Sequence, residues 1–335
     1  MPARGRLGGP APWALVCVVL LVVLFAVSLA FGTRVVSLSE VLGSLTGSPD
    51  GIAEAAARKR VPRTVLGMLI GGALAVSGAT MQAITRNPLA EPGILGISSG
   101  ASLAVVIGVA FFGLSGAYGY MLLAVIGAAA AAVFVYVVGS MGRGGATPLK
   151  LALAGAATTA AATSLISAIL LPRVEVMANF RFWQIGGVGG ASWERIGIVA
   201  PFLALGMLVC LYNARGMNSL ALGDDVAVGL GANVVRTRVA SAIGAVLLCG
   251  VATAIAGPIS FVGLVVPHIF RLLIGTDHRW LLPLSALGGA VLLVAADVVG
   301  RVVAKPEEIE VGIVTAVIGA PVLIWVVRQQ RVREL

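Results

Sequence analysis

Few side chains in this chain could carry out acid–base, nucleophilic or metal chemistry, and their spacing supports none of these. The two histidines, His268 and His278, are single and separated, which favours structural roles over ligation of haem iron. The three cysteines lie inside apolar runs without paired spacing, which favours buried thiols over a disulfide framework or a metal site: Cys17, Cys210 and Cys249. We expect no catalytic residue, no bound metal and no cofactor in this chain.

The lysines exclude a nucleotide site of the P-loop type. That pattern requires Gly-Lys followed by Ser or Thr. Lys59, Lys150 and Lys305 are instead followed by Arg, Leu and Pro. If the chain takes part in active transport, the energy must come from a partner subunit or from an ion gradient.

An acidic pair, Asp224-Asp225, lies in a loop from about 214 to 238. Around it Leu222, Val226 and Leu230 recur at helical spacing, and a helix N-terminus favours negative charge. Adjacent helix residues point about 100° apart, which disfavours a shared metal or catalytic site. The pattern predicts a short helix with one apolar edge, which lies either on the membrane or in a groove of a soluble partner.

Three arginines lie near the ends of predicted apolar runs. Arg60 and Arg63 lie three residues apart at a predicted helix start and therefore share a face. Arg301 lies near the end of another apolar run, four residues after Asp297. Two alternatives stay open: the arginines can extend to lipid headgroups, and Asp297 can neutralise Arg301 in an i,i+4 ion pair.

The elements that must position these residues are apolar runs. Of 335 residues, 59% are hydrophobic and 11% charged, whereas soluble proteins carry roughly 25% charged residues. A membrane helix needs about 20 apolar residues. The net charge of +9 is spread between the runs, so a nucleic-acid-binding surface is not expected.

The runs predict an all-α polytopic membrane protein, a single transmembrane domain over 1–335 with about ten transmembrane helices. An even number of spans puts both termini on one side, and terminal arginines favour the cytoplasm. A polar segment at 33–58 and an interfacial segment at 172–192, with Phe180, Phe182 and Trp183, are expected at the outer surface. The predicted spans are about 13–32, 62–82, 93–112, 119–139, 149–171, 193–213, 238–257, 259–274, 280–302 and 311–328.

The stretch from Lys59 to Ala104 carries a family resemblance. The residues that match are Arg60-Val61-Pro62-Arg63-Thr64, Ser77-Gly78-Ala79, Gln82 and Asn87-Pro88-Leu89-Ala90-Glu91-Pro92-Gly93 with Leu95-Gly96. Similarity continues from about Val61 to Trp325 and includes the closing run from Glu310 to Pro321. On these residues the chain resembles FecCD-type permease subunits of ABC importers for ferric siderophores, haem and cobalamin (type II importers).

The resemblance implies a transport permease and not an enzyme. Two copies, most simply a homodimer, would form a central pathway in the cytoplasmic (inner) membrane of a bacterium. Two ATP-binding subunits would lie inside and hydrolyse ATP, and a substrate-binding protein would dock outside. The implied cargo is an iron–siderophore complex moved by alternating access, with haem or cobalamin as alternatives. A secondary transporter driven by an ion gradient is a more distant alternative, which would need membrane-buried ionisable residues.

The resemblance also implies roles for individual residues. Residues 219–233 would form the coupling loop to the ATPase, and two turns would contribute gates. A plain structural turn is the alternative for each gate, and hydroxyls that bond back to their own helix are the alternative for the pathway. Beside the second gate the family often has hydroxyl residues where this chain has Pro148 and Leu149. The implied residues are Arg60, Arg63 and Arg301 for docking of the binding protein; Leu222, Gly223, Ala227, Leu230 and Gly231 for coupling; Asn87, Pro88, Leu89 and Thr147 for gates; and Thr158, Thr159, Thr163 and Ser164 for the pathway.

Overall fold

The computed structural model describes residues 9–32, 52–93, 96–114, 116–141, 147–173, 177, 180 and 183–331. All regular structure in these ranges is α-helical, in agreement with the predicted all-α class. Three of the terminal arginines that favour a cytoplasmic orientation, Arg4, Arg6 and Arg333, lie outside the described residues, as does Phe182 of the predicted interfacial segment. The helices are α1 (Pro10–Ala30), α3 (Ile52–Thr85), α4 (Ile97–Phe112), α5 (Ala117–Ser140), α6 (Pro148–Leu170), α8 (Trp193–Tyr212), α9 (Ala214–Leu220), α10 (Asp224–Gly229), α11 (Val234–Ala256), α12 (Val262–Ile274), α13 (His278–Val303) and α14 (Val311–Arg331).

Local sequence signals mark the starts of several helices. The side chains of Thr147, Ser192 and Asn233 each accept a hydrogen bond from a backbone N–H in the first turn of α6, α8 and α11. Asp277 does the same for α13. Such side chains satisfy donors that a helix start would otherwise leave free, which matters more in lipid than in water.

Seven of the described helices are long and apolar enough to cross a membrane: α1, α3, α5, α6, α8, α11 and α13. Three shorter apolar helices, α4, α12 and the first part of α14, complete the set predicted from the sequence. With 16 residues α4 is about 24 Å long, and α12 with 13 residues is about 20 Å long. Neither reaches across a hydrocarbon core of about 30 Å by itself.

Irregular backbone precedes both of these short helices. We predicted starts near 93 and 259, but α4 begins at Ile97 and α12 at Val262. Within the described residues, turns replace helix before α4, and Phe261 has a positive φ of 72° at the start of α12. Irregular backbone at membrane depth is tolerated only where protein or water surrounds it, so these segments belong in the interior of the bundle.

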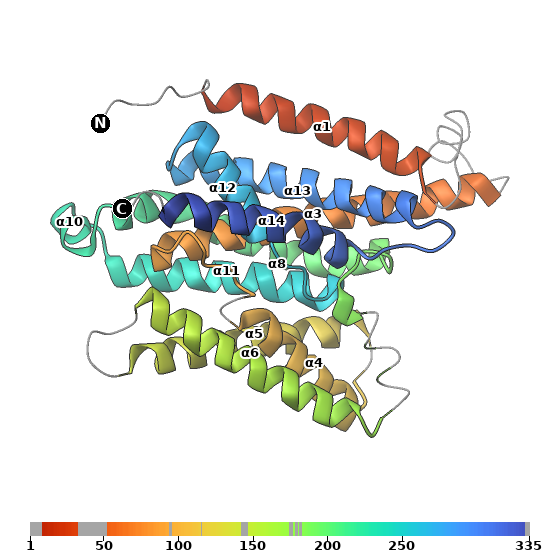
Figure 1. Ribbon diagram of the computed structural model, residues 1–335, viewed down its shortest axis with the longest axis horizontal. Helices are drawn as coiled ribbons and strands as arrows, with labels where there is room; N and C mark the ends of the chain where they lie inside the picture. Colours follow the sequence, from red (N-terminus) through yellow and green to blue (C-terminus); the bar gives the residue numbers. More distant parts are fainter. Residues whose placement is uncertain are drawn as a thin grey trace.

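The helix α3 is the axis of the bundle. It packs against α13, α12, α11 and α1, and in Figure 1 it lies between α1 on one side and the group α4, α5 and α6 on the other. Glycines permit these contacts, because a Cβ on Gly71 would collide with the backbone of Gly289 in α13. A Cβ on Gly78 would collide with Gly263 in α12 in the same way. Small residues thus let backbones touch where no hydrophobic effect drives helices together.

The structure adds detail to the two segments expected at the outer surface. Residues 33–51 lie outside the described residues, and the rest of the 33–58 segment is helical, since α3 begins at Ile52 and not near 62 as predicted. In the 172–192 segment, Phe180 is buried and packs with Ile166 and Leu170 of α6. Trp183 donates its indole N–H to the Ala254 carbonyl at 3.1 Å. These aromatic side chains fasten the segment to the bundle.

Candidate functional site

The helices α9 and α10 lie together at one end of the bundle. In Figure 1 this is the end where α1 begins and where α14 ends. Gly223, with φ of 111°, precedes α10, and Gly231, with φ of 79°, follows it. These backbone conformations favour glycine, so the two glycines predicted to take part in coupling shape the turns that present α10.

The apolar edge predicted for α10 is exposed. Leu222 and Leu230, which flank the helix, are 61% and 65% exposed, and Val226 within it is half exposed. Ala227 is fully buried and packs inward, so it cannot touch a partner directly. Of the predicted coupling residues, Leu222 and Leu230 therefore offer contact surface, while Ala227, Gly223 and Gly231 support it.

A carboxylate clamps α10 to two long helices. Asp224, the first residue of α10, accepts two hydrogen bonds from Arg238 of α11, at 2.9 and 3.0 Å. It also forms an ion pair with Arg86, the residue that follows α3. Arg86 in turn donates to the Leu220 carbonyl at 2.8 Å. The sequence suggested only that Asp224 favours the helix N-terminus; the arginine partners were missed, since they come from distant segments.

A second set of contacts ties α9 to the start of α13. Asn218 donates to the Asp277 carboxylate at 2.7 Å and accepts from the backbone N–H of His278 at 2.9 Å. Hydrogen bonds from Arg279 hold the pKa of Asp277 well below its ordinary value, and Asn218 adds to this effect. The structural role favoured for His278 agrees with these contacts, and Asp277 caps α13 beside it.

The two predicted gate turns lie on different segments. Asn87 accepts a hydrogen bond from the Leu89 N–H at 3.0 Å, which forms a compact polar turn after α3. Thr147 caps α6 by accepting from the Lys150 N–H at 3.3 Å. Among the described residues no hydrogen bond joins the two turns. Each is fully explained as a structural turn, and their gating role stays a prediction.

Glu91, for which the sequence predicted no role, connects two segments of the chain. Its side chain is buried, and its carboxylate accepts a hydrogen bond from the Phe261 N–H at 2.5 Å. Glu91 lies in the irregular segment before α4, and Phe261 lies in the one before α12. A carboxylate at a helix start stabilises the exposed N–H groups there, so this contact joins the two irregular segments.

The hydroxyls of α6 differ in their hydrogen bonds and in their exposure. Thr158 donates back to the Ala154 carbonyl at 2.7 Å and Ser164 to that of Ala160 at 2.9 Å, as hydroxyls in helices often do. Thr159 accepts a hydrogen bond from Ser99 of α4 at 3.3 Å. Thr163 and Ser164 are exposed on the free side of α6. That free side is the part of the helix that could line a pathway.

At the opposite end of the bundle, two arginines share one buried carboxylate. Asp297 binds Arg63 at 2.8 Å through one oxygen and Arg301 at 2.9 Å through the other. Arg63 also binds Glu308 at 2.7 Å. The i,i+4 ion pair between Asp297 and Arg301, one of the sequence alternatives, is therefore formed.

Arg301, together with Arg60, also holds α1. Arg301 donates to the Ser28 hydroxyl at 2.6 Å, and Arg60 donates to the Leu29 carbonyl at 2.7 Å. Arg301 is 1% exposed and Arg60 is buried as well. Direct docking by these two residues would require exposure that this conformation lacks. The neighbouring Arg58 and Lys59 are exposed on the same turn of α3.

Among the described residues, no group of three histidine, cysteine or carboxylate side chains could hold a metal ion. All three cysteines are free and buried. Several ion pairs instead join different parts of the bundle, among them Arg63–Asp297 and Arg238–Asp224.

Comparison with known proteins identifies similar membrane transport permeases. The model of the FecCD transport family matches residues 20–329. The ferric enterobactin transport system permease protein FepD of Escherichia coli (strain K12) is 42% identical over 312 residues, which is 93% of each chain. The hemin transport system permease protein HmuU of Yersinia pestis is 39% identical over 277 residues, covering 81% of this chain and 82% of HmuU.

The iron(3+)-hydroxamate import system permease protein FhuB of Bacillus subtilis (strain 168) is 44% identical over 272 residues, covering 81% of this chain and 71% of FhuB. Among solved structures, an inward-facing metal-chelate type ABC transporter is similar, with a TM-score of 0.81 and 27% identity over 96% of this chain and 99% of the other. The family match spans almost all of the described helices. This chain belongs to the FecCD transport family of permeases.

Proposed function

We propose that this chain is the membrane-spanning permease subunit of an ATP-driven importer, and that it moves an iron–siderophore complex across the cytoplasmic membrane of a bacterium by alternating access. The observation that carries the proposal is the exposed apolar edge of α10, clamped through Asp224 to Arg86 and Arg238. A partner that binds this edge can pull on α3 and α11 at once. Such a connection suits a chain that takes its energy from an ATPase subunit.

The cargo class is supported by the relatives. FepD is named for ferric enterobactin and FhuB for iron(3+)-hydroxamate, whereas HmuU is named for hemin. We place an iron–siderophore complex first for this chain, and haem or cobalamin second. The exposed hydroxyls Thr163 and Ser164 of α6 would line the pathway, with the 87–89 turn and Thr147 as inner gates.

The assembly that we propose contains two copies of this chain, two ATP-binding subunits at the α10 end and a substrate-binding protein at the other end. Both termini would then lie in the cytoplasm. ATP would bind only to the partner subunits, and this chain would need no cofactor of its own.

We propose docking residues for the binding protein that differ in part from those implied by the resemblance. Arg60 and Arg301 are buried, so we propose that the exposed Arg58 and Lys59, with Arg63 beside them, supply the positive charge that meets the partner. Reversal of both charges, R58E with K59E, should slow capture of the binding protein at low salt, and the difference should shrink as salt is raised. Arg195 is exposed at the outer end of α8, so the charge reversal R195E serves as the control. Equal capture by wild type and the double variant would refute this assignment.

The test of the function is uptake by cells that lack this chain, with the wild-type chain restored. Labelled catecholate and hydroxamate ferric siderophores, haem and cobalamin are offered in parallel. We expect a ferric siderophore to enter, to keep entering after the proton and sodium gradients are collapsed while ATP is maintained, and to be excluded when the ATPase subunit is absent. Uptake that stops with the gradients would instead favour a secondary transporter. The neutralisation of Asp297 by two arginines argues against that outcome.

A further inference from the structure

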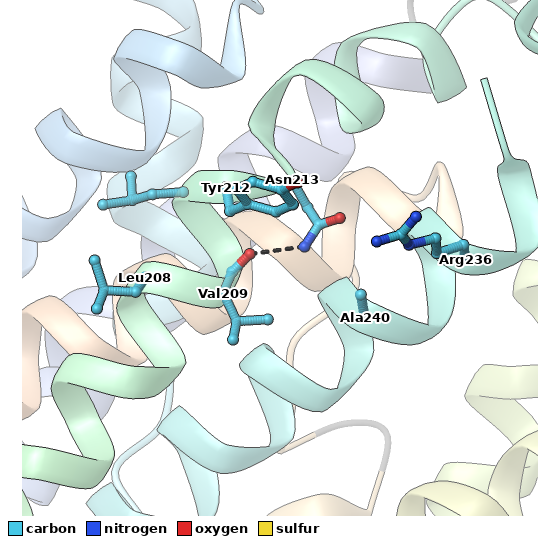
Figure 2. A pocket seen from close by; sticks show the side chains of 7 residues that line it. Leu208, Val209, Tyr212, Asn213, Arg236 and Ala240 are labelled. Atoms are coloured by element: carbon cyan, nitrogen blue, oxygen red, sulfur yellow. Dashed lines mark hydrogen bonds between the residues drawn. The ribbon is translucent and has the colours of Figure 1, made fainter. Parts of the chain in front are cut away.

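An open groove lies between α8 and α11 at the end of the bundle that carries α10. Its volume is about 720 Å³, within the usual range for small-molecule sites. Its walls include Leu208, Val209 and Tyr212 of α8 and Arg236 and Ala240 of α11. Figure 2 shows Arg236 extending from α11 toward Asn213, which follows α8, with Ala240 one turn further along α11.

The groove is closed toward the middle of the bundle by close helix packing. A Cβ on Gly206 of α8 would lie 2.9 Å from Leu248, and one on Gly244 of α11 would lie 2.8 Å from the Cys210 sulfur. Beyond this contact the small side chain of Ala240 leaves space that α8 does not fill. The Asn213 amide turns back to the Val209 carbonyl at 2.8 Å and so does not occupy the groove.

The groove lies where two candidate membrane spans have their ends. The candidate span of α8 ends at Tyr212 and that of α11 begins at Val234, so both walls lie at the same end of neighbouring spans. Tyr212 is 82% exposed at this level, where tyrosine rings are typically found. Leu208 and Val239, both exposed, continue the apolar surface toward the membrane interior.

Arg236 gives the mouth of the groove a positive charge that no carboxylate of the described residues neutralises. Its guanidinium is exposed and forms no ion pair with any carboxylate in the described part of the chain. Asp224, a nearby carboxylate on α10, is already bound by Arg86 and Arg238. Arg215, two residues after Asn213, adds a second exposed positive charge at this end.

We infer that this groove binds an anionic phospholipid, with the phosphate at Arg236 beside Tyr212 and an acyl chain along Leu208, Val209 and Ala240. Apolar walls and a single cation at the membrane surface match the two parts of such a lipid, since basic pockets between membrane helices bind anionic headgroups. In the orientation proposed above, this lipid lies in the cytoplasmic leaflet. The binding itself does not depend on that orientation. A lipid there would touch α11, which carries Arg238 of the α10 clamp.

The test is native mass spectrometry of the purified full-length chain titrated with phosphatidylglycerol or phosphatidylcholine of matched acyl chains. We expect wild type to retain phosphatidylglycerol over phosphatidylcholine by about fivefold, the effect of one surface cation. The variant R236Q should lose this preference, and R195Q, at the other end of α8, should keep it. A240F should reduce retention of both lipids, because the added ring fills the space of the acyl chain.

Three results would overturn the inference. One is equal retention of the two lipids by wild type, and another is an unchanged preference in R236Q. The third is displacement of the lipid by millimolar glycerol 3-phosphate, which would mean that the headgroup binds without the groove. Because R236Q changes only an exposed side chain, its thermal unfolding midpoint without added lipid should equal that of wild type, which separates lost binding from lost folding.

Discussion

At the scale of single residues, Asp297 is a buried carboxylate that binds two arginines. Its side chain is 3% exposed and lies between the guanidinium groups of Arg63 and Arg301. Removing one partner of a buried ion pair typically costs about 3–5 kcal/mol, because the remaining charge is left without compensation. We expect D297A to lower the free energy of unfolding by that amount, as measured by denaturant unfolding of the purified chain in detergent.

The control for this prediction is Glu308, the other carboxylate that binds Arg63. It is one-third exposed, and exposed ion pairs contribute about 1 kcal/mol or less. E308A should therefore leave stability nearly unchanged. Equal decreases in the free energy of unfolding in E308A and D297A would show that burial does not make the Asp297 ion pairs more stabilising.

The sequence revealed part of this cluster. The spacing of Asp297 and Arg301 already predicted their ion pair as one alternative, because i and i+4 lie on the same helix face. Arg63 reaches the same carboxylate from 234 residues away, and no local pattern encodes such a contact. For the same reason the burial of Arg60 against α1 could not be foreseen.

At the scale of elements, the clamp on α10 determines how motion of this helix reaches the bundle. Asp224 binds Arg86 and Arg238, whereas the adjacent Asp225 is exposed and binds neither. We expect D224N to reduce ATP-driven uptake severalfold while leaving assembly with the ATPase intact, because the apolar edge of α10 is unchanged. Uptake normalised to membrane expression, together with copurification of the ATPase, measures the two effects.

Asp225 provides the matched comparison for this clamp. D225N removes the same charge one residue along the helix and should leave uptake at the wild-type level. If D224N and D225N behave alike, negative charge near the ATPase matters and the link to α3 and α11 does not.

The packing of α3 makes a second prediction at this scale. A Cβ on Gly71 would collide with the backbone of Gly289, whereas one on Gly67 would make an ordinary contact of 3.6 Å with Val294. G71A should destabilise the chain by about 1–3 kcal/mol or more, as overpacking does. G67A should be neutral or slightly stabilising, since alanine favours helix. The thermal unfolding midpoints of the two variants test this prediction. An unchanged midpoint in G71A would mean that α3 and α13 can move apart to make room for the added methyl group.

The positions of most helices could be predicted well, whereas the starts of α3, α4 and α12 could not. Long apolar runs mark α1, α5, α6, α8 and α13, because lipid selects composition over about 20 residues. The starts of α4 and α12 were placed too early, since apolar composition cannot distinguish a helix from irregular backbone enclosed by protein.

At the scale of the whole molecule, Glu91 joins the two irregular segments inside the bundle through the Phe261 N–H. E91A would leave that buried donor without a partner, at a cost of about 1–3 kcal/mol. E91Q keeps an oxygen that can accept the bond and should retain most of the stability. We expect the free energies of unfolding to rank wild type, E91Q and then E91A; an E91A variant as stable as wild type would show that the two segments are held by other contacts.

The attachment of α1 to α13 has a consequence for biosynthesis. α1 is made first, yet Arg301, which binds the Ser28 hydroxyl, and Asp297, which neutralises Arg63, are translated only when α13 appears. Until then α1 lies in the bilayer without its main anchor, and Arg63 enters the membrane without its counter-ion. A nascent chain arrested before α13 should therefore hold α1 only through its contacts with α3, so insertion of a late helix completes the attachment of the first one.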